Sequence, residues 1–115
     1  MTNVDTYTAK IYLGFKEGYL DYSFLSPMNM LRETIRDHIN NGHPMCVNIT
    51  ETHYIYVDGS EVGACIELIN YPRFPLSPIL LRDKAFILAD LLKEKFRQER
   101  VSVVCTDKTY MLGNK

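Results

Sequence analysis

The sequence predicts an α+β domain in which strands and helices alternate along one chain. Three observations predict it: alternating apolar residues mark four β segments, apolar residues at helical spacing mark two helices, and two Ser-Pro pairs mark the helix starts. The 115 residues contain no linker and no low-complexity stretch. We therefore expect a single domain spanning 1–115.

The first element is expected to be a strand over 8–15, where apolar and polar residues alternate as in a strand with one buried face. A loop over 16–25 follows it. At Ser26-Pro27 the serine suits a helix N-cap and the proline suits the first helical position. The helix is expected to end at Asn41-Gly42.

A β-hairpin is expected next. The range 45–57 alternates again, and Asp58-Gly59 is typical of a tight turn between two strands. The return strand continues the alternation through Leu68. Gly63 within it predicts a bulge or the close approach of another chain.

The last third begins with a proline-rich loop over 70–76. Ser77-Pro78 repeats the capping pattern and opens a helix with an apolar stripe lasting to about Gln98. The last core strand is expected over 101–105, with a short extension over 109–112.

The resulting order β-α-β-β-α-β predicts a ferredoxin-like sandwich. In this fold a four-stranded antiparallel sheet has the spatial order 4-1-3-2, and both helices cover one face. We expect the central strands 1 and 3 to run parallel, so that the loops following them are neighbours. The two helix N-termini would then point to one place.

The point where the two helix N-termini are expected to meet is predicted to bind a small anion. Helix N-termini carry unpaired N–H groups and partial positive charge, and the two loops add aromatic side chains and two cations. These groups fit a nucleotide-like ligand, with the cations on its phosphates and the aromatic faces on its base. The alternatives are that the aromatic residues only plug the end of the core, or that they contact another subunit. The candidate ligand-binding residues are Lys16, Tyr19, Tyr22, Phe24, Tyr71, Arg73 and Phe74.

The sheet face away from the helices is expected to be rich in tyrosine and threonine. Such a face can stack bases or pair with another sheet. Ile11 to Phe15 loosely resembles the first-strand motif of the RNA-recognition motif, but Glu61 and Glu67 stand where RNA would need cations. The residues expected on this face are Lys10, Tyr12, Thr50, Thr52, Tyr54, Cys65, Glu67 and Ile69.

Composition and charge exclude several classes of protein. Hydrophobic residues make up 46% of the chain and the net charge is -1, so neither disorder nor bulk binding to nucleic acid or lipid is expected. No apolar run reaches the length of a membrane span, and the first residues lack a signal peptide, so we expect a cytoplasmic protein. Three cysteines without a CxxC pair predict reduced thiols.

The sequence contains no recognisable catalytic motif. His38, His43 and His53 have neither metal-ligand spacing nor an evident nucleophile beside them. We therefore expect no catalytic residues, no metal and no cofactor, and predict that the protein is not an enzyme.

Three stretches together resemble the phage anti-Thoeris proteins that sequester cyclic ADP-ribose signals. They are Lys10 to Phe15, the hairpin leading into Ile66 to Ile69, and Phe96 to Val103. The resemblance implies a non-enzymatic oligomer that captures a nucleotide signal of host immunity in the host cytoplasm. The alternatives are a homo-oligomeric structural or protein-interaction module and a weak single-stranded RNA binder.

Overall fold

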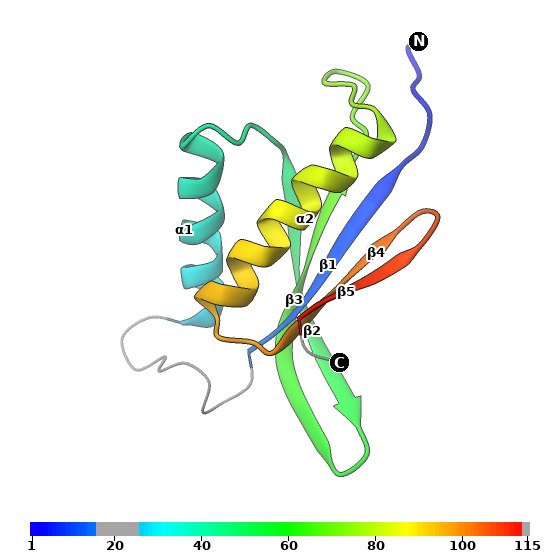
Figure 1. Cartoon of the computed structure of the whole chain (residues 1–115). Coiled ribbons are helices and arrows are strands. Elements are labelled where there is room, and N and C mark those ends of the chain that lie inside the picture. The colour runs from blue at the N-terminus through cyan, green and yellow to red at the C-terminus, as the bar shows by residue number, and fades with distance from the viewer. Residues whose placement is uncertain (16–25, 114–115) are drawn as a thin grey trace.

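The computed structural model describes residues 1–15 and 26–113 (Figure 1). It confirms the α+β class and the order of the predicted elements, and it adds one strand. The elements are β1 (Thr8–Gly14), α1 (Pro27–Asn40), β2 (Val47–Tyr56), β3 (Gly59–Ile69), α2 (Pro78–Lys95), β4 (Arg100–Cys105) and β5 (Thr109–Gly113).

The sheet is antiparallel and has the order β2-β3-β1-β4-β5. Its first four positions are those of the ferredoxin-like arrangement, but the predicted number of four strands is wrong. A turn closed by a hydrogen bond from the Cys105 amide to the Lys108 carbonyl, at 2.9 Å, sends the chain back as β5. Tyr110 of β5 packs edge-on against Phe86 of α2, with ring centroids 4.9 Å apart. The short predicted extension is therefore a full edge strand that also contacts a helix.

The expected parallel direction of the two central strands is wrong. β1 and β3 pair antiparallel, with Gly14 opposite Gly63 at one end and Thr8 opposite Ile69 at the other. The single crossing of α1 leaves β2 parallel to β1, and the tight hairpin then reverses the chain into β3. The segments that follow β1 and β3 therefore leave from opposite ends of the sheet, and the two helices begin at opposite ends (Figure 1).

Both helices begin as the Ser-Pro pairs predict. The Asn29 amide donates to Ser26 Oγ, and the Leu80 amide donates to Ser77 Oγ, each at 3.2 Å. Proline occupies the first turn of each helix, where an amide hydrogen would have no partner within the helix. Gly42, with φ +98°, follows the end of α1 in the left-handed region that favours glycine.

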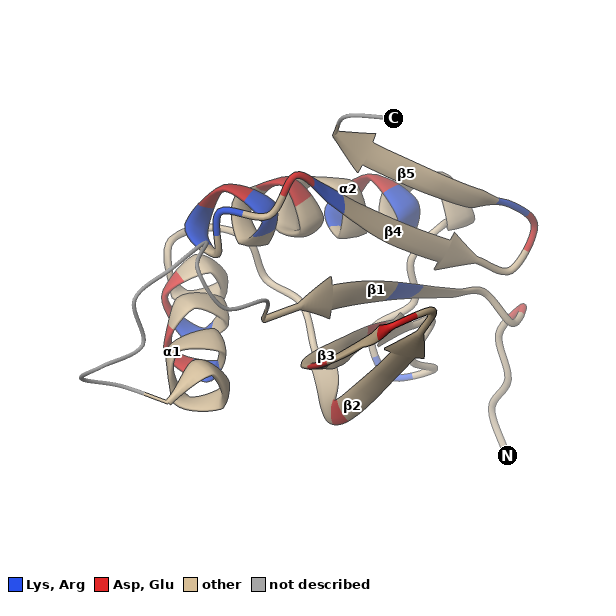
Figure 2. Ribbon diagram, turned by 90° about the horizontal axis from the view of Figure 1, so that it is seen from below, with Lys and Arg blue, Asp and Glu red and all other residues tan. Residues whose placement is uncertain are grey.

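One core lies between the sheet and the helices, which cover the same face (Figure 2). Ile11 and Leu13 of β1, Leu31 of α1, and Leu88 of α2 are completely buried there. The side chains that alternate with these in the strands form the open face, as predicted. On it Lys10 pairs with Glu67 across β1 and β3, with 3.8 Å between Nζ and Oε2.

Candidate functional site

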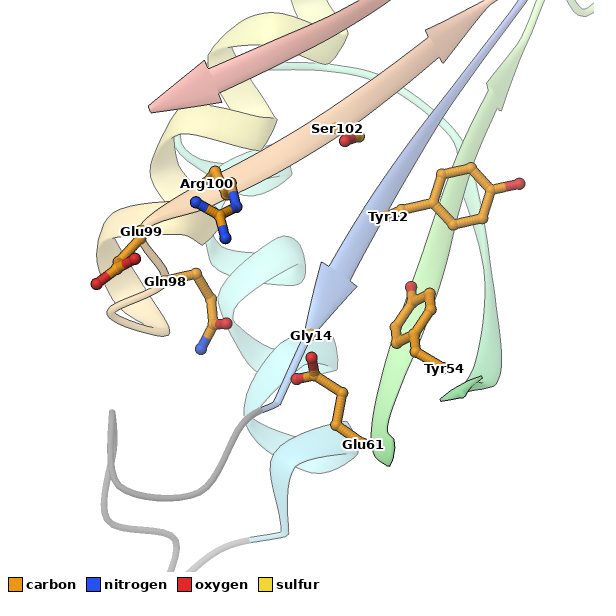
Figure 3. Close-up of a pocket in the computed structure, with 8 residues that line it drawn as sticks. All are labelled: Tyr12, Gly14, Tyr54, Glu61, Gln98, Glu99, Arg100 and Ser102. Carbon is orange, nitrogen blue, oxygen red and sulfur yellow. The ribbon is translucent and has the colours of Figure 1, made fainter. Parts of the chain in front are cut away.

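A pocket of about 290 Å³ opens on the helix-free side of the sheet, where β1 ends and β4 begins (Figure 3). We call it the open-face pocket. One wall comes from the β2–β3 hairpin, the other from β4 and the segment just before it. Its lining residues are Tyr12, Gly14, Tyr54, Glu61, Gln98, Glu99, Arg100 and Ser102.

The floor of this pocket exists because two glycines face each other. Gly14 of β1 lies opposite Gly63 of β3, so the centre of the sheet carries no side chain there. A Cβ on Gly14 would lie 2.6 Å from Glu61 Oε2, and a Cβ on Gly63 would lie 2.4 Å from Cε2 of the Tyr54 ring. The groups that approach Gly63 most closely are the Tyr54 ring and the Leu13 carbonyl of the same chain. The register passes through it without a bulge.

Glu61 has one oxygen that lacks a partner in the pocket. Within residues 1–15 and 26–113, its Oε2 is inaccessible to solvent and accepts no hydrogen bond. In the same part of the chain no carboxylate pairs with Arg100, the cation on the opposite wall. A desolvated carboxylate oxygen without a donor is costly, because nothing replaces the water it has lost. The charge of a cationic ligand bound in the pocket beside this carboxylate would offset part of that cost.

Tyr54 supplies a rigid aromatic wall. Its hydroxyl lies 3.2 Å from the Ala64 carbonyl oxygen and 3.5 Å from that of Leu13, within donating distance of both. Burial, the largest cause, raises the pKa of Tyr54, and the nearby Cys65, Tyr12 and Glu61 act in the same direction. The hydroxyl therefore keeps its proton at neutral pH, and the ring remains a neutral surface against which a cation or a base can lie.

The pocket combines groups of both signs. Carboxylates and tyrosine faces attract a cation, while the Arg100 guanidinium suits a carboxylate or phosphate. Figure 3 shows Glu61 and Tyr54 on one side of Gly14, with Arg100 and Gln98 on the other. A ligand that carries separated positive and negative groups matches this arrangement better than a simple anion.

The predicted loop site is not assembled as expected. Lys16, Tyr19, Tyr22 and Phe24 lie outside the described residues. Tyr71 and Phe74 line a different cavity at the opposite end of the sheet. Arg73 is exposed and lies over the Phe74 ring, with 5.5 Å from its Cζ to the ring centroid. The predicted meeting of the two helix N-termini is wrong, because it rested on parallel central strands.

Sequence reasoning placed Tyr12 and Tyr54 on the open face, but it missed the pocket between them and β4. For Glu61 the sequence predicts only that its negative charge disfavours RNA binding. The signal that could have found the pocket is the pairing of two glycines in adjacent central strands, since this leaves a hollow. That pairing depends on the register, which the sequence alone did not supply.

In the described part of the chain, no three His, Cys, Asp or Glu side chains come together to hold a metal ion. None of the described helices is long and apolar enough to cross a membrane. Cys46, Cys65 and Cys105 are free thiols.

Comparison with known proteins finds similarity in structure alone. No known protein family matches the sequence, and no curated protein matches it. A solved structure of a phage S-adenosylmethionine (SAM) lyase in complex with S-methyl-5'-thioadenosine has a TM-score of 0.73 at 19% identity, over 99% of this chain and 94% of that one. A phage SAM lyase in the apo state has a TM-score of 0.67 at 20% identity, over 95% and 90% of the two chains.

These structures overturn two predictions. The expected non-enzymatic sponge for cyclic ADP-ribose signals is wrong, and so is the prediction that the protein is not an enzyme, because the fold matched over nearly the whole chain is that of a lyase. The similar structures are phage proteins, as the resemblance implied, and they are named as SAM lyases rather than as anti-Thoeris proteins. At this level of identity the likeness establishes the fold that the chain shares with phage SAM lyases.

Proposed function

We propose that this protein is a lyase that cleaves SAM and releases S-methyl-5'-thioadenosine, and that the substrate binds in the open-face pocket. The observation that carries the proposal is the unpartnered, desolvated oxygen of Glu61 in a fold shared with a SAM lyase. SAM carries a sulfonium cation, an α-carboxylate and an adenine base. The pocket offers a carboxylate, a guanidinium and tyrosine rings for these groups.

The products follow from the chemistry of the substrate. S-methyl-5'-thioadenosine keeps the sulfur, its methyl group and the adenosine, so the bond that breaks joins sulfur to Cγ of the methionine part. Sulfur takes the electron pair and becomes a neutral thioether. The four-carbon fragment is balanced without water, either by losing a proton or by closing a ring through its own carboxylate.

Glu61 is assigned to substrate binding. Its attraction to the sulfonium is strongest before cleavage and disappears when sulfur becomes neutral, so it favours the substrate over the thioether product. Such an interaction stabilises the bound substrate, so it lowers KM without raising kcat. Tyr54 adds cation–π attraction from the side, and Arg100 orients the reacting fragment through its carboxylate.

The test is to incubate the purified protein with SAM and measure S-methyl-5'-thioadenosine by liquid chromatography. SAM also decays without a catalyst, so the rate in buffer must be subtracted. Glu61→Gln is expected to raise KM by about tenfold with a smaller effect on kcat, since a charge-assisted contact contributes about 1.5–3 kcal/mol. Glu51→Gln is the matched control, because Glu51 is exposed on β2 and does not line the open-face pocket. Product formation at the buffer rate would refute the proposal.

We also propose that the protein forms homo-oligomers through the tip of the β2–β3 hairpin. The tip extends beyond the end of β1 (Figure 1). Ile55 and Val57 there have exposed fractions of 85% and 90%. Burying such residues against a second copy removes apolar surface from water. Light scattering at several concentrations tests this, and a wild-type monomer throughout, or an Ile55→Ser variant with the same mass as wild type, would contradict it.

The cellular location of the protein also remains a proposal. SAM is a water-soluble metabolite, so a lyase acting on it would work in the cytoplasm. If the protein is of phage origin, that is the host cytoplasm, where removal of a host metabolite would fit a counter-defence role. Expression in bacteria, followed by measurement of the cellular SAM pool, tests this: an unchanged pool would contradict it.

A further inference from the structure

A second cavity lies at the other end of the sheet, between the start of β2, the end of β3 and the first turns of α2. Its volume is about 500 Å³, within the range of small-molecule sites in proteins. We call it the apolar cavity. The lining residues used below are Cys46, Leu68, Tyr71, Phe74, Leu80, Leu81 and Lys84.

The apolar cavity has a buried floor and an exposed apolar rim. Leu68 and Leu81 form its floor with exposed fractions of 3% and 0%. Phe74 and Leu80 on the rim are 61% and 46% exposed. These large apolar side chains surround a cavity and remain in contact with water. Covering them with an apolar group of a ligand lowers the free energy of the system.

Lys84 is the only charged side chain that lines the cavity among the described residues. Its ammonium donates one hydrogen bond to the Pro44 carbonyl, at 3.0 Å, which leaves two of its three hydrogens for another acceptor. The Tyr71 hydroxyl is the neighbouring polar group. A hydrogen bond to Cys46, burial and the charges of Cys46 and Glu67 raise the pKa of Tyr71, so its hydroxyl stays protonated and its one hydrogen is directed at Cys46.

We propose that the apolar cavity binds a small amphipathic carboxylate. Its apolar body would cover Leu68 and Phe74, and its carboxylate would accept a hydrogen bond from Lys84 and a second from Tyr71 in exchange for the one to Cys46. An anion is favoured over a cation because the described lining holds a lysine and no acidic residue. The site is independent of the proposed lyase activity, since it lies at the opposite end of β1 and β3. It uses Tyr71 and Phe74, two of the residues singled out in the sequence, and leaves Arg73 outside the lining.

The experiment measures binding of octanoate by calorimetry, with 1-octanol and octylammonium as matched neutral and cationic probes. Octanoate is expected to bind most tightly of the three. Lys84→Met, which keeps an unbranched side chain but removes the charge, should weaken octanoate binding by about tenfold or more. Lys108→Met is the control, because Lys108 is exposed in the turn between β4 and β5.

The Cys46 thiol provides a second measurement. Cys46 is exposed and lines the cavity, so its alkylation by iodoacetamide can be followed by mass spectrometry of the peptide that contains it. Octanoate should slow this reaction in the wild type and much less in Lys84→Met. Equal binding of all three probes, absence of octanoate binding at millimolar concentration, or unchanged binding and protection in a folded Lys84→Met variant would each overturn the proposal.

Discussion

Replacing Gly14 with alanine tests the proposed role of the open-face pocket. The added Cβ would lie 2.6 Å from Glu61 Oε2, whereas ordinary contacts begin at 3.4 Å. The Glu61 carboxylate must therefore retreat by about 0.8 Å, the difference between these two distances. Because the atom in the way is the end of a flexible side chain, the backbone of β1 can stay in place. The substitution moves the carboxylate without removing it.

The expected effects on binding and on stability have opposite directions. A displacement approaching 1 Å weakens an oriented contact, and we expect KM for SAM to rise by about tenfold, which corresponds to 1.4 kcal/mol. Gly14 has no left-handed backbone angle, so alanine fits its conformation. Alanine also restricts the unfolded chain, which adds about 0.4–1 kcal/mol to the free energy of unfolding. The variant should be as stable as the wild type, or more stable, while it binds SAM less well.

The assay combines SAM cleavage kinetics with thermal unfolding on the same preparations. Gly59→Ala is the matched control, because the atoms nearest to a Cβ there belong to the Tyr56 ring at the hairpin tip, outside the open-face pocket. Gly59→Ala should leave KM unchanged. A wild-type KM in a folded Gly14→Ala variant would refute the assignment of Glu61 to substrate binding, even if the protein proves to be a lyase.

Three further predictions concern stability. Gly63→Ala should destabilise the protein by about 1–3 kcal/mol in urea unfolding, because its Cβ would lie 2.2 Å from the Leu13 carbonyl oxygen and would force β1 and β3 apart; a stability equal to that of the wild type would contradict this. Phe96→Ala should cost about 3–5 kcal/mol, since the ring is completely buried and packs against Phe15. Burial, with the charges of His43 and Lys84, lowers the pKa of His38, so below its unfolded value of 6.5 the unfolded chain binds more protons and stability falls as the pH falls. A His38→Gln variant should show a smaller loss of melting temperature between pH 7.5 and pH 5.5, and a slope equal to that of the wild type would exclude His38 as the cause.

Local signals in the sequence located most of the elements correctly. Ser26-Pro27 and Ser77-Pro78 mark the two helix starts because capping and the fixed φ of proline act over three or four residues. The hairpin forms where the Asp58-Gly59 pair predicts it, although the positive φ, 59°, falls on Asp58 alone and Gly59 already pairs with Tyr56. The fifth strand was expected only as a short extension, because its packing against Phe86 is a contact between segments far apart in the sequence.

The position of the site could not be found in the same way, because it depends on strand direction. The sequence analysis predicts that β3 runs parallel to β1, and it therefore places the loop containing Tyr71 at the wrong end of the sheet. The open-face pocket beside Glu61 forms because β1 and β3 run antiparallel and because their register places Gly14 opposite Gly63. Neither follows from local preferences, since glycine in a strand predicts only that something approaches closely.

The antiparallel pairing of β1 with β3 also separates the two cavities. From the Gly14–Gly63 pair to the Thr8–Ile69 pair the strands advance six residues, or about 20 Å. The open-face pocket adjoins the first pair and offers carboxylates for a cation, whereas the apolar cavity adjoins the second and offers Lys84 for an anion. Groups this far apart, with no shared partner, act almost independently on binding and stability. Ligands of opposite charge can therefore occupy the two ends of the same pair of strands without competing.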